Sequence, residues 1–280
     1  MSRNKYLRGG LEVVLFVVVF ALLQAFAMQF VAVAAALWHG ADFRGVFHAL
    51  RSDMVLQDAS LLIAAQLLGS ALQVLLFWRC RWAFFGRSYI ATRPWVTLCW
   101  VAVLTLGTIL PSEWLVETLQ LEMPEAQEQA LAAIMEQPLG YLAVGVLAPL
   151  AEETVFRGAV LRRLLEVVGR RAHWLAIIIS ALLFGLVHGN NAQFVHAFLL
   201  GLLLGWMFYR TGSILPGMVL HIVNNSIAYA VYNLLPHLRD AQLIDLFSGN
   251  DRTLCLSLFF SLCLFVPALF QLALRMRRQA

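Results

Sequence analysis

Three ionisable side chains fall within six positions of a strongly apolar stretch, APLAEETVFRGAVLRRLL at residues 148–165. If this stretch is a helix, Glu153 and Arg157 lie one turn apart on one face, in the order that favours an ion pair. Glu152 is rotated about 100° away and has Phe156, not a cation, one turn further on. We therefore expect Glu153 to stay ionised against Arg157, whereas Glu152, if it faces a poorly solvated cavity, should suit the role of a proton-transferring group.

Two later stretches carry polar groups that could serve the same chemistry. FGLVHGNN places His188 near the end of a helix, and HIVNN puts His221 and Asn225 on one helical face, with Asn224 pointing elsewhere. A carboxylate, two imidazoles and a carboxamide meet the needs of amide hydrolysis, which requires a base for water, donors for the oxyanion and screening from bulk solvent. Taken singly, each group has a simpler role in ion pairing or interhelical hydrogen bonding.

The elements that must position these groups are membrane helices. Of the 280 residues, 61% are hydrophobic and 13% are charged, which is far from the composition of a soluble domain. Runs such as LEVVLFVVVFALL are apolar on every face, whereas the strands of a membrane barrel alternate. About 20 helical residues cross a bilayer core. We predict an all-α polytopic membrane helical bundle of about eight transmembrane helices, at 11–38, 59–78, 95–111, 139–161, 173–189, 192–209, 214–232 and 253–274.

The 20 Lys and Arg residues predict the orientation of the bundle. Most of them fall on one side, at the two termini, in the 79–94 loop and around 157–171, whereas the other side has few. By the positive-inside rule both termini are cytoplasmic, and we expect an integral protein of the bacterial cytoplasmic (inner) membrane. The net charge of +4 is then a topology signal and implies no nucleic-acid partner. The residues on the sparse side are Arg44, Arg51, Arg239 and Arg252.

Three motifs, in order along the chain, are similar to those of the CPBP family, which comprises type II CAAX prenyl endopeptidases and bacterial relatives linked to bacteriocin processing and self-immunity. EETVFR at 152–157 resembles the family's EExxxR motif, FGLVH at 184–188 its FxxxH motif, and HIVNN at 221–225 its HxxxN motif. The resemblance covers roughly 139–232. It implies an eight-helix intramembrane endopeptidase that acts on a membrane-associated, prenylated or leader-type peptide.

The resemblance also implies a role for each motif residue. Glu152 would be the general base that activates a water molecule, and His188 would position that water. His221 and Asn225 would donate hydrogen bonds to the oxyanion. The second glutamate and the arginine of the first motif would hold this constellation in place. The expected partners are the lipid bilayer and a peptide or protein substrate, with the oligomeric state left open.

The same residues leave the metal question open. The zinc signature HExxH is absent. His188, His221 and Glu152 would satisfy the ligand count of a catalytic zinc, but a ligating Glu152 would leave the base role to Glu153. We favour a glutamate mechanism without a cofactor, and a divalent metal such as Zn is the alternative. His196, on the sixth predicted span, is interpreted as a packing or hydrogen-bonding residue.

We expect one membrane domain with three parts. Residues 1–138 hold transmembrane helices 1–3 and an outer acidic loop, 139–232 form the CPBP-like catalytic core, and 233–280 form the C-terminal loop and last helix. In the acidic loop, AQEQALAAIMEQ has the pattern of a short amphipathic helix. Two other functions remain: a non-catalytic immunity or scaffold protein of the same fold, and a proton-coupled transporter, which the lack of an inverted repeat disfavours.

Overall fold

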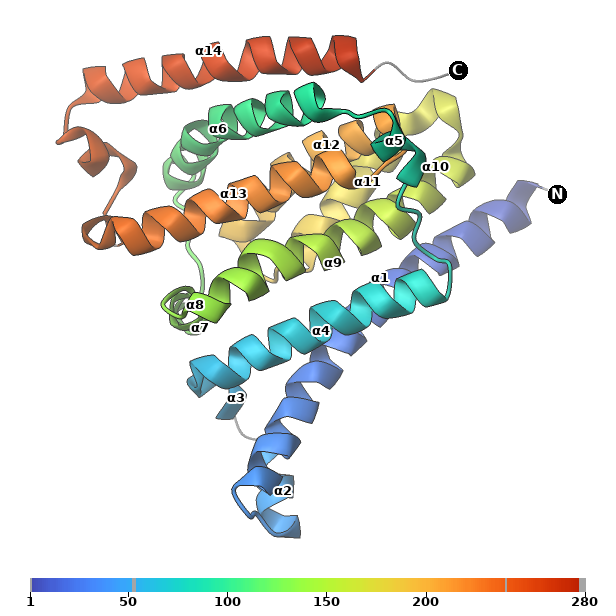
Figure 1. Cartoon of the computed structure of the whole chain (residues 1–280), viewed down its shortest axis with the longest axis vertical. Coiled ribbons are helices and arrows are strands. Elements are labelled where there is room, and N and C mark those ends of the chain that lie inside the picture. The colour runs from blue at the N-terminus through green and yellow to red at the C-terminus, as the bar shows by residue number, and fades with distance from the viewer. Residues whose placement is uncertain (1, 52–53, 240, 277–280) are drawn as a thin grey trace.

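The computed structural model describes residues 2–51, 54–239 and 241–276, and over these it contains helices and no strand (Figure 1). This confirms the predicted all-α bundle. The long helices are α1 (Ser2–Trp38), α4 (Ala59–Arg79), α6 (Trp95–Thr118), α11 (His173–Leu186), α12 (Asn191–Thr211), α13 (Leu215–Leu234) and α14 (Asp251–Arg275). A continuous helical stretch from 138 to 168 contains α8 (Pro138–Gly140), α9 (Ala148–Val155) and α10 (Arg162–Val168).

Shorter helices complete the chain. The loop predicted to hold an amphipathic helix forms α7 (Glu125–Met135), which buries Ile134 and Met135 and confirms that prediction. The others are α2 (Phe43–Ala49), α3 (Met54–Gln57) and α5 (Arg87–Ala91), with 3₁₀ turns at Arg170–Ala172, Pro236–Leu238 and Leu243–Phe247.

Each of the eight predicted spans is largely helical, but the helices differ in length and in apolar character, and not all of them meet the requirements for crossing a membrane. Within the described residues, 6 helices are long and apolar enough to do so: α1, α4, α6, the stretch Pro138–Val168, α12 and α14. The helix α11 has only 14 residues. The helix α13 has 20 residues but is not among the six, and it carries His221, Asn224 and Asn225. A count of eight spans therefore stays a prediction.

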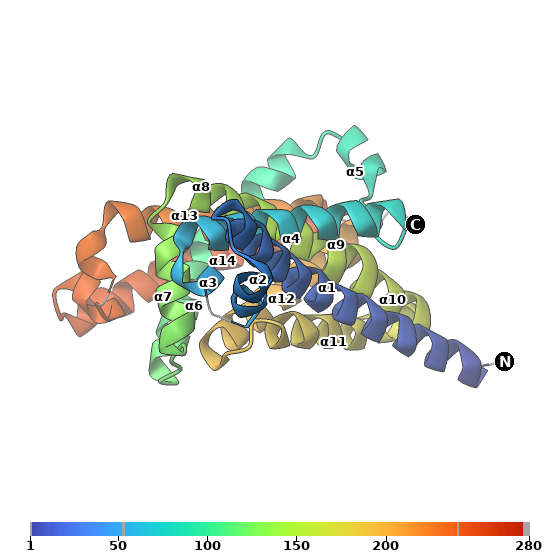
Figure 2. The same cartoon turned by 90° about the horizontal axis from the view of Figure 1, so that it is seen from below.

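The stretch that contains α9 lies in the middle of the bundle (Figure 1). It packs against α4 and α13, while α1 packs on the outside of α4, and α6 lies between α13 and α14. The pair α11 and α12 pack on each other, and Figure 2 shows α11 on the opposite side of the bundle from α5. Helices from both halves of the sequence therefore surround the EExxxR segment.

The largest buried side chains of the bundle include a charged one. Arg157 is among the largest fully buried side chains, together with aromatic residues such as Phe77, Phe156 and Phe184. Many large apolar side chains point outward instead, for example Phe259 and Phe260 on α14. An apolar exterior suits contact with lipid. The polar groups of membrane proteins are found instead between the helices. The fold thus places its charged motif at the centre and its hydrophobic surface outside.

Candidate active site

The central helix is widened on both sides of the two glutamates. Seven residues before α9, Tyr141–Leu147, and six residues after it, Phe156–Leu161, form π-helical turns. The Ala148 N–H bonds to the Ala143 carbonyl, five residues back, next to Pro149, which has no N–H to give. Such π segments occur often at functional sites because they rotate the side chains that follow. Here they flank Glu152 and Glu153 and include Arg157.

Glu153 and Arg157 form a sealed ion pair, as their spacing predicts. Arg157 Nη1 lies 2.7 Å from Glu153 Oε1, and the exposed fractions of the two side chains are 1% and 0%. The Arg157 guanidinium also stacks over the Phe184 ring at 4.3 Å. Glu153 Oε2 and two further nitrogens of Arg157 have no hydrogen-bond partner within the described part of the chain. The pair is therefore closed off from solvent, which indicates a role in placing other groups.

His221 lies between the two glutamates. Its Nδ1 is 3.5 Å from Glu153 Oε1, and its Nε2 is 3.6 Å from Glu152 Oε2. The glutamates differ in exposure, since 19% of the Glu152 side chain is accessible whereas Glu153 is fully buried. The helix α13 thus places the His221 imidazole between two carboxylates that leave α9 in different directions. Only Glu152 is open to a cavity.

His188 is held at the edge of the same cavity. Its Nδ1 lies 2.9 Å from the Phe184 carbonyl oxygen, one turn earlier on α11. The Phe184 ring meets the rings of His188 and His221 edge to face, with centroids 5.2 Å and 5.8 Å apart. Because Arg157 stacks on this ring as well, Phe184 contacts three of the motif residues. The FxxxH spacing puts Phe184 one helical turn before His188, but this supporting role is visible only in the structure.

Asn225 is anchored to the π segment before α9. Its Nδ2 donates to the Val144 carbonyl at 2.8 Å, and its Oδ1 accepts from Asn224 Nδ2 at 3.2 Å. The Asn224 Nδ2 also lies 3.4 Å from His196 Nε2. The expectation that Asn224 points elsewhere is therefore wrong: it lines the same cavity as Asn225, because the cavity is wide enough to meet more than one face of α13. His196 lines it too.

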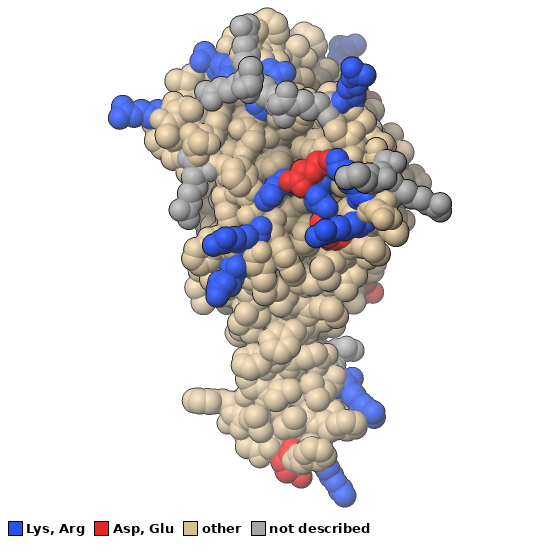
Figure 3. All heavy atoms as spheres, turned by 90° about the vertical axis from the view of Figure 1, so that its right-hand side faces the viewer, with Lys and Arg blue, Asp and Glu red and all other residues tan. Residues whose placement is uncertain are grey.

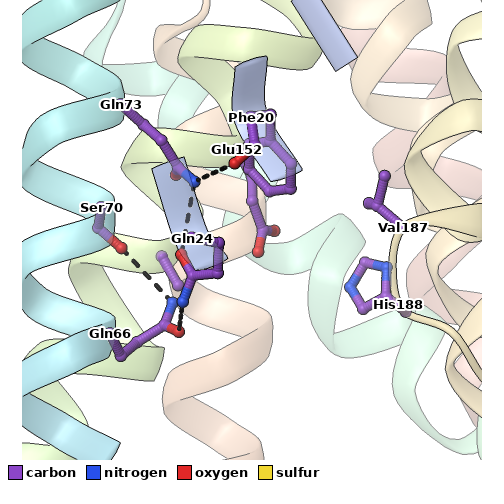
Figure 4. Close-up of a pocket in the computed structure, with 9 residues that line it drawn as sticks. Phe20, Gln24, Gln66, Ser70, Gln73, Glu152, Val187 and His188 are labelled. Carbon is purple, nitrogen blue, oxygen red and sulfur yellow. Dashed lines mark hydrogen bonds between the residues drawn. The ribbon is translucent and has the colours of Figure 1, made fainter. Parts of the chain in front are cut away.

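These side chains share one large cavity. A space of about 790 Å³ is bounded by α4, α6, α7, α9, α11, α12 and α13 and includes Glu152, His188, His221 and Asn225 in its wall. A second cavity of about 160 Å³ lies toward α1 and α4 and has Glu152, His188, Gln66 and Ala148 in common with the first. Figure 4 shows Glu152 and His188 on facing sides of this smaller cavity. The accessible glutamate thus stands where two cavities meet.

The proposed zinc ligands are not arranged as a metal site. Among the residues that the structure describes, no three His, Cys, Asp or Glu side chains are placed to hold one ion. Glu152 and His221 approach each other, whereas His188 bonds to a backbone carbonyl through Nδ1 and has Nε2 as its remaining ring nitrogen. Two histidines and a glutamate are a ligand set that catalytic zinc uses, but as placed in the described residues these three side chains do not converge on one point.

The site can be compared with known proteins. A family model described as "Type II CAAX prenyl endopeptidase Rce1-like" matches residues 134–227. Comparisons with curated proteins and with solved structures found no match. The matched segment runs from the end of α7 into α13 and contains all three motifs, whereas α1, α4, α6 and α14 lie outside it. Residues 134–227 thus form a domain similar to the Rce1-like type II CAAX prenyl endopeptidases, which is consistent with a protease of the CPBP family.

Proposed function

We propose that the protein is an intramembrane endopeptidase that uses a water molecule activated by Glu152 to cleave a membrane-associated peptide, either prenylated or of leader type. The observation that carries this proposal is the shared cavity. Glu152, His188, His221 and Asn225 come from three separate helices and line one space inside the bundle. A base, a water-positioning group and oxyanion donors are thereby gathered where bulk solvent is restricted.

In the proposed reaction, Glu152 takes a proton from water while the water oxygen attacks the carbonyl carbon of the scissile amide. His188 positions this water from the opposite side of the cavity. The carbonyl becomes a tetrahedral oxyanion, the C–N bond then breaks, and Glu152 passes the proton to the departing amine. The products are a carboxylic acid and an amine, so that one water is consumed for each bond cleaved.

The oxyanion would be stabilised from α13. Asn225 Nδ2 gives one hydrogen to the Val144 carbonyl and keeps its second hydrogen for the substrate. His221 Nε2 faces the Glu152 side and would donate as well. His221 Nδ1 faces Glu153 Oε1 at 3.5 Å, so that Nε2 is the nitrogen left to face the oxyanion. The buried ion pair of Glu153 with Arg157 then acts as a positioning group for His221.

We also propose that both termini face the cytoplasm of a bacterium. The start of α1 and the end of α14 lie at the same end of the bundle, and Figure 3 shows Lys and Arg side chains gathered over that end. Arg8 and Arg163 there share Glu12. Arg277 and Arg278, which contribute to the charge count of this side, lie outside the described residues. The partners would be lipid and the peptide substrate.

The test is cleavage of a panel of prenylated and leader-type peptides by the purified protein in detergent, run in ¹⁸O-labelled water. We expect one ¹⁸O atom in the new carboxyl group of the product, with cleavage unaffected by a strong chelator. Loss of cleavage in chelator that is restored by added zinc would overturn the metal-free mechanism. No cleavage of any peptide by protein that is folded would contradict the proposed activity.

Gly217 offers a test of the positioning role of Glu153. A Cβ at Gly217 would lie 2.6 Å from Glu153 Oε2, so Gly217→Ala should displace that carboxylate and with it His221. We expect kcat to fall about 10- to 100-fold, because misplacement by about 1 Å is costly in catalysis. The measurement is kcat beside the thermal midpoint in detergent.

Gly10→Ala is the matched control for this variant, since a Cβ at Gly10 of α1 meets nothing within 4 Å. It should leave kcat at its wild-type value and should not lower the thermal midpoint, because alanine is more favourable than glycine in a helix. Wild-type kcat in Gly217→Ala would show that the close contact of α13 with Glu153 is unimportant for the reaction.

A further inference from the structure

A cluster of carboxamides faces the active site from helices outside the matched domain. We call Gln24 of α1 with Gln66, Ser70 and Gln73 of α4 the glutamine cluster. Gln24 Nε2 donates to Gln66 Oε1 at 2.9 Å, and Gln73 Nε2 donates to the Phe20 carbonyl at 3.2 Å and to Gln24 Oε1 at 3.4 Å. A longer contact of 3.5 Å joins Gln66 Nε2 to Ser70 Oγ. All four residues line the smaller cavity (Figure 4).

The cluster has more hydrogen-bonding capacity than its internal bonds use. Each carboxamide nitrogen carries two hydrogens, and each oxygen has two lone pairs. Gln24 and Gln66 each give one hydrogen to the described bonds, and Gln73 Oε1 accepts none within the part of the chain that the structure describes. Polar groups in a membrane interior are costly when they are unsatisfied. Donors and an acceptor are therefore left for something in the cavity.

A glycine on α4 leaves the space that the Gln24 carboxamide occupies. A Cβ at Gly69 of α4 would lie 2.5 Å from Gln24 Oε1 and 3.2 Å from its Cδ. Any larger residue at Gly69 would push the Gln24 carboxamide out of its place. The close approach of α1 to α4 is thus arranged around the carboxamide, and the cluster has a fixed geometry.

The glutamine cluster lines the same cavity as Glu152 and His188. Glu152 and His188 belong to the walls of both cavities, and so does Gln66. Figure 4 shows Glu152 between the cluster and His188. A peptide whose scissile bond lies at Glu152 would extend into the large cavity on one side and toward the glutamine cluster on the other. A bond that only joined α1 to α4 would not need to face this space.

We propose that the glutamine cluster is a substrate subsite, which binds the backbone amide of a residue next to the scissile bond. Carboxamides present a donor and an acceptor side by side, which matches the N–H and C=O of a peptide group. The subsite recognises peptide backbone and not a particular side chain. This inference rests on the proposed function and assigns to α1 and α4 a direct part in it.

The test compares amide peptides with analogues in which one N–H is replaced by an ester oxygen, at the bond before or after the scissile bond. For the wild type, we expect one of the two esters to raise KM about tenfold, as the loss of one hydrogen bond would. In Gln66→Leu, the amide peptide itself should show the raised KM, and the ester should be cleaved no worse than the amide. The kcat should change little, because Glu152 and His188 remain in place.

A second variant keeps every polar group. Gly69→Ala should also remove the preference for the amide, since it displaces Gln24, and alanine is favourable in a helix. Gly10→Ala is its matched control. Asn233→Leu is the control for Gln66→Leu, because Asn233 is also a carboxamide that joins two helices, through the Met135 carbonyl at 3.0 Å, but its own side chain is in the wall of neither cavity. Both controls should discriminate between amide and ester as the wild type does.

The outcomes separate this proposal from the proposed function. If the wild type cleaves amide peptides and Gln66→Leu and Gly69→Ala retain the wild-type preference for the amide, the subsite is wrong and the peptidase stands. The same conclusion follows if neither ester raises KM in the wild type. If the folded wild type cleaves no peptide, the peptidase assignment fails first, and the subsite fails with it.

Discussion

Glu152→Gln is expected to reduce kcat by about 10²- to 10⁴-fold, the usual contribution of a general base. Glutamine has almost the same size but cannot take a proton from water. Because the contact of Glu152 Oε2 with His221 Nε2 is long, at 3.6 Å, and 19% of the Glu152 side chain is accessible, the exchange should leave the fold intact. The measurement is steady-state cleavage of the best peptide of the panel, with the thermal midpoint recorded in the same detergent.

The matched control is Glu166→Gln, which removes a half-exposed glutamate that pairs with Arg162 and Arg163 at the end of the bundle. It should retain wild-type kcat. Undiminished cleavage in Glu152→Gln would refute the role of this residue as base. If deletion of the gene produces a phenotype and Glu152→Gln restores it fully, the protein serves as an immunity factor or scaffold in that setting, without catalysis.

Arg157→Met is expected to give the largest loss of stability. It leaves Glu153 as a buried, uncompensated charge, and breaking a buried pair in this way costs about 3 to 5 kcal/mol. The substitution also removes the stacking of the guanidinium on Phe184, whose ring supports His188 and His221. The measurement is the free energy of unfolding in a detergent titration, with the yield of folded protein as a second readout.

Two further variants show whether charge is the cause. Arg157→Met combined with Glu153→Gln should recover much of the lost stability, because neutral replacements for a buried pair are often tolerated. Activity should stay low, since His221 would lack its carboxylate partner. Arg162→Met breaks an exposed pair with Glu166 and should change stability by about 1 kcal/mol or less. A single Arg157→Met variant as stable as the wild type would rule out the ion pair as a structural requirement.

The sequence by itself determined the class of the protein and the local pairs. The apolar runs predicted an all-helical membrane bundle, because the rise per residue of a helix is fixed and about 20 apolar residues therefore cross a bilayer core. Their lack of a two-residue alternation excluded strands. The ion pair of Glu153 with Arg157 followed from a spacing of one turn, and the two charged groups lie 2.7 Å apart. The three motifs resembled those of a family of peptidases. The family model that matches residues 134–227 agrees with this resemblance.

Contacts between helices were decided only by the tertiary structure. That His221 lies between the two glutamates, that Phe184 supports the motif residues, and that Asn224 joins the cavity depend on how α9, α11 and α13 approach one another. The π turns beside α9 rotate its side chains, and glycines such as Gly217 and Gly69 set how closely helices meet. Spacing within one helix carries no information on these distances.

The glutamine cluster shows the same limit most clearly. Gln24 and Gln66 are 42 positions apart in the sequence and lie outside every motif, so each looks like an isolated polar residue in an apolar run. Only the packing of α1 on α4, and of α4 on α9, brings them to the cavity that Glu152 faces. The sequence thus determined which helices form and which residues could react. The tertiary structure decided which helices enclose the reaction, because that choice depends on side-chain fit between segments far apart in the chain.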